Sequence, residues 1–296
     1  MLPIYSWRFM ARPRRAGQRK ACIYIVGKCT MVVRYFVMPG INMGSFFSSG
    51  LGTSLSALAA NLLAPPKCLM WHEDAGSHGG ACPACWQNLT IIEPPLCPRT
   101  GVPFPYDPGD DIIGAAALAN PPAWKRARAA VQFDEHARIL VHALKYRDQH
   151  YAGRMMAAMM ARAGAELINN ARFMVPVPLH RARLWRRRFN QSALLAHRLA
   201  RDTDAPCRPD ILARVKPTRP QVGLRAKDRR RNLRGAFKVP EKAFLEIAGS
   251  NILLIDDVLT TGTTAKACAD ELLSAGAAQV DILVFALVVR PAAMDI

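Results

Sequence analysis

The sequence of 296 residues has no uninterrupted apolar run of the length that a membrane span needs. About 20 apolar residues are required to cross a bilayer, so an integral membrane protein is not expected. Cysteine is also sparse, because there are only eight, and four of them lie between positions 68 and 97. A scaffold held by disulfides would spread its cysteines more evenly, whereas this clustering favours a metal site in a reducing compartment. We therefore expect a cytoplasmic protein.

Acidic residues are scarce in two segments of the chain, which carries a formal charge of +18. Residues 1–60 contain eight Lys or Arg and no Asp or Glu, and residues 181–234 contain 17 Lys or Arg against four Asp. The second segment is suited to bind phosphate, on a small molecule or on nucleic acid. The alternative is a solvated, arginine-rich surface.

The N-terminal segment differs from the rest of the sequence. Residues 1–42 are basic, lack clear periodicity and lack the compact apolar region of a secretory signal. We expect a disordered extension, or one that results from an upstream start codon, since several internal methionines offer other starts. An arginine-rich targeting segment is the alternative. Residues 43–64 are expected to form a short apolar helix that ends before Pro65.

Residues 65–100 are expected to form a small, zinc-finger-like module. A C-x-x-C knuckle, here Cys82-Pro-Ala-Cys85, points two thiolates at one ion, and zinc takes four ligands in a tetrahedron. Two further cysteines flank the knuckle and are the expected other ligands. The predicted zinc ligands are Cys68, Cys82, Cys85 and Cys97.

The cysteine pattern departs from a complete double knuckle at two positions. Further cysteines would stand near residues 71 and 100, where the chain has Trp71 and Thr100. His72 and His78 are spare ligand candidates. The main alternative is a metal-free module with reduced thiols. A redox pair is disfavoured, because no βαβ pattern surrounds the C-x-x-C knuckle.

The rest of the chain has the pattern of an α/β domain. Residues 101–125 are rich in Pro, Gly and Asp and are expected to be a linker with little regular structure. Apolar periodicity then alternates between strand and helix through residues 126–292, which predicts a mostly parallel sheet flanked by helices. Strands are expected within 126–133, 172–180, 251–256 and 280–289. Helices are expected within 134–148, 152–168, 190–202 and 264–276.

The strongest chemical signal follows the strand at 251–256. Asp256 and Asp257 stand at its carboxyl end, and a hydroxyl-rich turn at 260–264 leads directly into a helix. Ligands of open α/β sheets bind at the carboxyl ends of strands, and a helix N-terminus offers free N–H groups to a phosphate. Adjacent carboxylates can accept hydrogen bonds from sugar hydroxyls or help to hold a metal. The segment thus predicts a site for a sugar phosphate, without the G-K-[ST] of a Walker loop; the alternative is a capped strand–turn–helix corner.

These motifs resemble a known family. The segment ILLIDDVLTTGTT is similar to the phosphoribosyl-pyrophosphate (PRPP) signature of type I phosphoribosyltransferases. The segments VPVPLHRARLWRRRFNQSALLA and TRPQVGLRAKDRRRNLRGAF, together with the cysteine module, resemble the ComF family of competence-type phosphoribosyltransferase homologues. The resemblance covers about residues 65 to 290. It implies a type I phosphoribosyltransferase-like domain behind a small cysteine-rich module.

The resemblance also implies roles for individual residues. The two carboxylates would bind the ribose hydroxyls of PRPP, the turn would hold its 5′-phosphate, and Mg²⁺ would bridge pyrophosphate and ribose oxygens. The PRPP-binding residues implied in this way are Asp256, Asp257, Val258, Leu259, Thr260, Thr261, Gly262, Thr263 and Thr264. The residues implied on the pyrophosphate or acceptor side are Lys145, His180, Arg181, Arg183 and Arg225.

Three functions are consistent with this sequence. The first is PRPP-dependent transfer of the phosphoribosyl group to an amine or base, in the natural-competence context that the resemblance implies. The second is a non-catalytic accessory that binds single-stranded DNA and competence proteins, which the basic segment 181–234 favours. The third is a sensor that binds PRPP without turnover. No side chain is expected to act as a nucleophile, because the ribose–pyrophosphate bond can break through an oxocarbenium-like transition state.

Overall fold

The computed structural model of the chain describes residues 24–26, 29–31, 68–70, 80–109, 112–146, 149–181, 184, 189–201, 203–216, 233 and 235–289. The chain divides into two units, residues 1–62 and 63–296. In the first unit, β1 (Tyr24–Val26) and β2 (Cys29–Met31) pair as an antiparallel hairpin. Over these six residues the structure differs from the unstructured extension that we expected. The helix expected at 43–64 lies outside the described residues.

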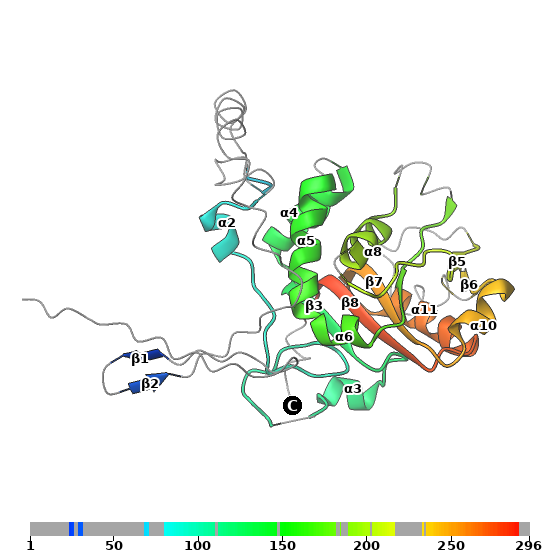
Figure 1. Ribbon diagram of the computed structural model, residues 1–296, viewed down its shortest axis with the longest axis horizontal. Helices are drawn as coiled ribbons and strands as arrows, with labels where there is room; N and C mark the ends of the chain where they lie inside the picture. Colours follow the sequence, from blue (N-terminus) through cyan, green and yellow to red (C-terminus); the bar gives the residue numbers. More distant parts are fainter. Residues whose placement is uncertain are drawn as a thin grey trace, which may run out of the picture. The chain divides into compact units, whose positions relative to one another are not determined.

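The second unit is built on a four-stranded sheet with the strand order β3-β8-β7-β4 (Figure 1). All three pairs of neighbouring strands are parallel. Helices cover both faces of the sheet. The two central strands, β7 and β8, are apolar along most of their length, as burial on both faces requires. This confirms the expected fold class. The strands are β3 (Ala127–Gln132), β4 (Phe173–Pro176), β7 (Asn251–Leu259) and β8 (Gln279–Leu287).

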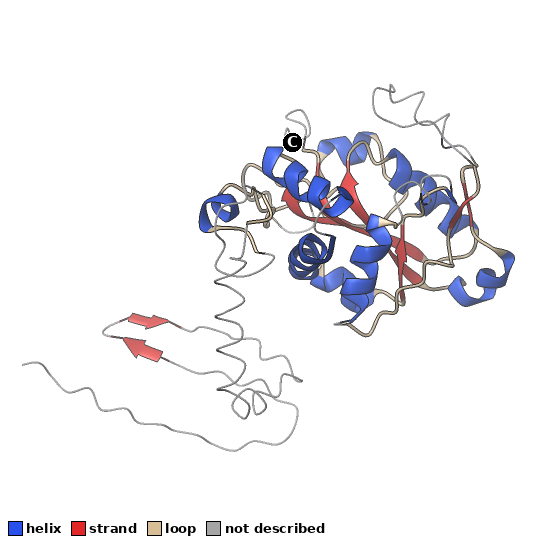
Figure 2. Cartoon of the chain, turned by 90° about the horizontal axis from the view of Figure 1, so that it is seen from above, coloured by secondary structure: helices blue, strands red, loops and turns tan. Residues whose placement is uncertain are grey.

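Helices lie on both sides of this sheet (Figure 2). Successive residues of a strand point to opposite faces, and the core accordingly forms two clusters. Leu253 and Phe285 belong to the cluster that includes α4 (Glu135–Tyr146), α5 (Gln149–Ala163) and α8 (Gln191–Arg201). Leu254 and Ile282 belong to the cluster that includes α11 (Thr263–Ser274).

Two segments differ from their sequence-based expectations. The single helix expected at 152–168 is broken at Gly164 into α5 and α6 (Ala165–Asn170). A Cβ at Gly164 would lie 2.6 Å from a methyl group of Leu283, so glycine allows this corner to approach the sheet closely. The expected linker 101–125 contains a short helix, α3 (Ala115–Ala119).

The remaining elements are short. Residues 213–214 and 237–238 form a two-stranded antiparallel sheet that contacts α11, and residues 241–247 form a helical turn. The described part of the cysteine module contributes one helix of five residues. Among the described residues, no helix is both long and apolar enough to cross a bilayer. The short elements of this second unit are α2 (Pro83–Gln87), β5 (Ala213–Arg214), β6 (Phe237–Lys238), η2 (Glu241–Ala243) and α10 (Phe244–Ile247).

Candidate functional site

Asp256 and Asp257 lie inside β7 rather than after it. The strand was expected to end at the first acid, but it continues to Leu259 because it stays paired with β8 as far as Leu287. Both carboxylates are half-buried. They lie at the carboxyl edge of the parallel sheet, on strand β7, which pairs with β8 on one side and with β4 on the other.

Asp256 is held by the first turn of α8. Its Oδ1 accepts a hydrogen bond of 2.8 Å from the Ser192 hydroxyl and one of 2.9 Å from the backbone N–H of Asp257. Burial, followed by the neighbouring Asp257 carboxylate, raises the pKa of Asp256 to about 7. This carboxyl group therefore changes its charge near neutral pH. Sequence analysis did not single out Ser192, although it lies in the NQS part of a motif that carries the family resemblance.

Asp257 forms an ion pair with a lysine from the opposite end of the domain sequence. The Lys145 ammonium, near the end of α4, lies 3.0 Å from Asp257 Oδ2, and both side chains are about one-fifth exposed (25% and 18%). The other oxygen, Oδ1, accepts a hydrogen bond of 2.8 Å from the N–H of Val258. Lys145 was predicted on the pyrophosphate side of the site, and the structure brings it to the carboxylate pair.

The hydroxyl-rich turn joins β7 to α11. Gly262 is the N-cap residue of α11 and has a left-handed backbone conformation, with φ of 69°. The hydroxyls of Thr261 and Thr263 are 2.8 Å apart on either side of it. The first turn of α11 leaves backbone N–H groups directed beyond the end of the helix, where a phosphate is stabilised by these donors and by the helix dipole.

Trp124 packs against this turn, which the sequence did not reveal. A Cβ at Gly262 would lie 2.7 Å from the Trp124 ring, and the Trp124 indole N–H donates a 2.8 Å hydrogen bond to the carbonyl oxygen of Arg99. Trp124 was expected only as part of a linker, because a single aromatic residue among Pro and Ala carries no periodic signal. The ring thus ties the turn to the cysteine-rich part of the chain.

Gly262→Ala is expected to destabilise the fold by about 2–4 kcal/mol, because it combines left-handed strain with overpacking against Trp124. Gly249→Ala is the matched control. Gly249 has a similar φ of 65°, but a Cβ at this position would have nothing within 4 Å, so only about 1–2 kcal/mol is expected there. Urea unfolding of the two variants measures the difference. Equal losses would show that Trp124 does not constrain the turn, whereas Gly262→Ala should destabilise a Trp124→Leu protein less than it destabilises the wild type.

Two other residues predicted on the pyrophosphate or acceptor side follow β4. His180 and Arg181 lie in the segment after this strand, with His180 half-buried and Arg181 exposed. Arg183 and Arg225 lie outside the described residues. Asn190 caps α8: its side-chain oxygen accepts a 3.2 Å hydrogen bond from the N–H of Ser192, and its amide donates a 3.0 Å bond to the carbonyl of Val177. This cap fixes the helix end that holds Asp256.

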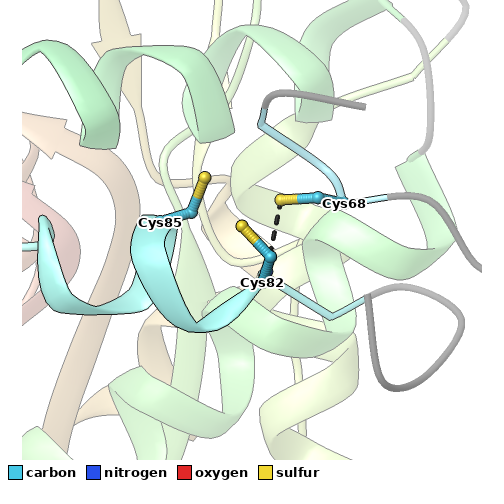
Figure 3. Close-up of side chains that lie close together, drawn as sticks. All are labelled: Cys68, Cys82 and Cys85. Carbon is cyan, nitrogen blue, oxygen red and sulfur yellow. Dashed lines mark hydrogen bonds between the residues drawn. The ribbon is translucent and has the colours of Figure 1, made fainter. Parts of the chain in front are cut away.

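The second candidate site is a cluster of three buried cysteines, Cys68, Cys82 and Cys85 (Figure 3). Their sulfur atoms all lie within 4.8 Å of one another. The backbone N–H of Cys82, at the N-cap of α2, donates a 3.3 Å hydrogen bond to the Cys68 sulfur. Burial, followed by hydrogen bonds with the Cys82 and Cys68 thiols, raises the pKa of Cys85 to about 12. Three thiolates at this spacing suit zinc, which would displace their protons on binding.

The structure does not bring Cys97 to these three cysteines. Its sulfur accepts a 3.4 Å hydrogen bond from the N–H of Gly114 and belongs to no cluster of potential ligands among the described residues. Burial raises the pKa of Cys97, but hydrogen bonds from the Thr100 hydroxyl and from the N–H groups of Gly114, Thr100 and Arg99 lower it more, so the net shift is downward. His72 and His78 lie outside the described residues.

Comparisons with known families match both candidate sites. Residues 59–116 match the double zinc ribbon domain, and residues 193–293 match the phosphoribosyl transferase domain. The first match contains the cysteine cluster, and the second contains the carboxylate pair with its turn. The ribbon match and the cluster together support a structural zinc ion.

Relatives of known name match along most of their own length. DNA utilization protein YhgH of Salmonella typhimurium is 33% identical over 212 residues, which cover 70% of this chain and 89% of the relative. The protein of the same name from Escherichia coli strain K12 is 31% identical over 213 residues, 69% of this chain and 89% of its own. Competence protein F of Haemophilus influenzae is 31% identical over 216 residues, 68% of this chain and 94% of that protein.

Proposed function

Because the chain belongs to the ComF family of competence and DNA-utilization proteins, we propose that it binds PRPP with Mg²⁺ and transfers the phosphoribosyl group to an amine or base. One observation carries this proposal. The half-buried pair Asp256 and Asp257 stands at the carboxyl edge of a parallel sheet, directly before the left-handed Gly262 turn and the N-terminus of α11. This arrangement provides acceptors for sugar hydroxyls beside donors for a phosphate.

The residues of the site divide these tasks. The carboxylates of Asp256 and Asp257 would accept hydrogen bonds from the ribose hydroxyls, and the turn at 260–264 would hold the 5′-phosphate through its N–H groups. Ser192 and Lys145 keep the two carboxylates in place. Lys145 also places a cation beside the ribose, where it would stabilise negative charge on the leaving pyrophosphate.

The chemistry needs no nucleophilic side chain. The bond between C1 of the ribose and pyrophosphate breaks with an oxocarbenium-like transition state, and pyrophosphate leaves with the bonding electron pair. The acceptor nitrogen then forms the new bond at C1 and releases a proton. Mg²⁺, when bound, supplies charge neutralisation of the pyrophosphate. Two carboxylates are too few for a magnesium site made of protein alone, but Mg²⁺ is commonly held by one or two carboxylates together with substrate phosphates. The donor set therefore fits an ion that arrives with PRPP.

Calorimetric titration of the full chain with PRPP tests this proposal, and we expect Mg²⁺-dependent binding that weakens at low pH. Since the pKa of Asp256 is about 7, its ionised fraction falls below that pH, and the Kd should rise about tenfold between pH 8 and pH 6. Absence of heat and of any thermal shift with folded protein at saturating PRPP would refute PRPP binding.

The Ser192→Ala variant distinguishes the titration of Asp256 from the titration of the phosphate groups of PRPP. Ser192→Ala removes the 2.8 Å hydrogen bond that lowers the pKa of Asp256, so the midpoint of the pH dependence should move to higher pH. The phosphate groups of PRPP are the same in both experiments. An unchanged midpoint would show that Asp256 does not govern the dependence.

Binding of single-stranded DNA is a second candidate function. It is favoured by the 17 Lys or Arg within 181–234 and by the names of the relatives, which refer to DNA utilization and competence. Such binding would rest on contacts between cationic side chains and phosphates. Its affinity should then fall steeply as salt concentration rises, with a log–log slope of about −0.7 per phosphate contact.

A further inference from the structure

We propose that this chain holds one zinc ion, at Cys68, Cys82 and Cys85, and that the second half of its ribbon module folds around Cys97 without metal. A double zinc ribbon implies two metal sites, each with four ligands. The first site has three thiolates, and His72 and His78 are the candidates for its fourth ligand, whereas the second site has one thiolate and no candidate histidine. The proposal concerns the module alone and is independent of PRPP binding.

The matched segment lacks ligands for a second ion. Within residues 59–116 the cysteines are those at 68, 82, 85 and 97, and both histidines precede Cys82. Thr100 stands where a knuckle beginning at Cys97 would place its second cysteine. From residue 98 to residue 116 there is neither cysteine nor histidine. A second ion would have a single thiolate and otherwise carboxylate or water ligands, whereas structural zinc sites use Cys and His.

Hydrogen bonds take the place of a metal at Cys97. This residue is almost fully buried (2% exposed), and its sulfur accepts bonds from the N–H of Gly114, at 3.4 Å, and from the Thr100 hydroxyl. The N–H groups of Arg99 and Thr100 also point to it. Thr100 thus contributes a donor to the sulfur, where a second cysteine would have contributed another ligand.

The turn that carries Cys97 is closed by its own backbone. The N–H of Cys97 donates a 2.9 Å bond to the carbonyl of Val102, and the N–H of Gly101 donates a 2.8 Å bond to the carbonyl of Cys97. The carbonyl of Arg99 accepts the indole N–H of Trp124. Gly101 has a φ of 72°, and a Cβ there would lie 2.9 Å from the carbonyl oxygen of Ala127 in β3. Contacts with the phosphoribosyltransferase-like domain therefore hold this turn, which removes the need for a coordinating ion.

Zinc content of the purified full chain tests the proposal, measured by elemental analysis after gel filtration. We expect one zinc per chain in the wild type, loss of zinc in Cys82→Ser, and one zinc in Cys97→Ser. The two variants make the same change at cysteines that are buried to nearly the same extent. Two zinc ions or none per wild-type chain would overturn the proposal, and so would loss of zinc in folded Cys97→Ser.

If the Cys97→Ser variant does not fold, Thr100→Val tests the same proposal. This variant removes the hydroxyl donor and preserves side-chain shape, so the melting temperature should fall while the zinc content stays at one per chain. A fall in zinc content would show that this half of the module helps to hold metal. An unchanged melting temperature would show that the hydrogen bond from Thr100 does not support the metal-free turn.

Discussion

Asp257→Asn is expected to weaken PRPP binding by about 100-fold or more at pH 8 in the presence of Mg²⁺. A hydrogen bond to a charged group contributes about 1.5–3 kcal/mol, and Asp257 would accept such bonds from the ribose. In the wild type the Lys145 ammonium lies 3.0 Å from an Asp257 carboxylate oxygen, and in the variant it would lie beside a neutral amide. The lost hydrogen bonds to the ribose act against binding, and calorimetric titration measures the net change in affinity.

Asp270→Asn is the matched control for this experiment. It makes the same change of charge on the exposed side of α11, where Asp270 pairs with Lys266 at 3.0 Å, and surface pairs of this kind contribute about 0.3–0.5 kcal/mol. PRPP affinity should then stay within about twofold of the wild type. Wild-type affinity in Asp257→Asn would remove this carboxylate from the binding site.

Binding of single-stranded DNA provides a second measurement on the Asp257→Asn variant. If DNA binds through the basic segment 181–234, Asp257→Asn should leave its affinity nearly unchanged while PRPP binding is lost. Equal loss of both ligands, with an unaltered melting temperature, would indicate one shared site. Equal loss with a lowered melting temperature would indicate that the variant is misfolded.

Removal of the metal from the three-cysteine cluster is expected to lower the melting temperature by about 10 °C or more. Zinc binding is worth about 10–16 kcal/mol in zinc-finger peptides, and a loss of only about 4 kcal/mol shifts a domain of this size by about 8–16 °C. The cluster is part of the same hydrophobic core as α4, α5 and the sheet residues Leu253 and Phe285, so its disruption reaches the larger domain. Thermal unfolding with and without a chelator, and of Cys82→Ser, measures the effect.

Cys207→Ser is the control for the cysteine substitution. Cys207 is half-buried and lies outside the metal cluster, so its replacement should change the melting temperature by only a few degrees, and chelator should lower the stability of this variant as much as that of the wild type. A wild-type melting temperature that does not respond to chelator, with zinc verifiably removed, would show that the ion contributes nothing to folding.

The class of fold and the principal site segment could be predicted from the sequence alone. Parallel strands that are buried on both faces appear as nearly continuous apolar runs, and their alternation with amphipathic helices is a local pattern. The carboxylate pair and the threonine-rich turn are contiguous, so their order along the chain already places them at a strand end and a helix start. The proximity of Cys82 and Cys85 follows in the same way from their spacing on one knuckle.

The distant residues that complete these sites become visible only when the elements are packed together. Ser192 reaches Asp256, Lys145 reaches Asp257 and Trp124 covers Gly262, although each pair is separated by more than 60 residues. Cys97 was expected beside the other three cysteines, but the structure places it against Gly114. Local periodicity predicts which face of an element is buried, whereas the partner that covers that face depends on how the elements pack. Long-range contacts of single polar side chains leave no periodic trace, and only the packed structure reveals them.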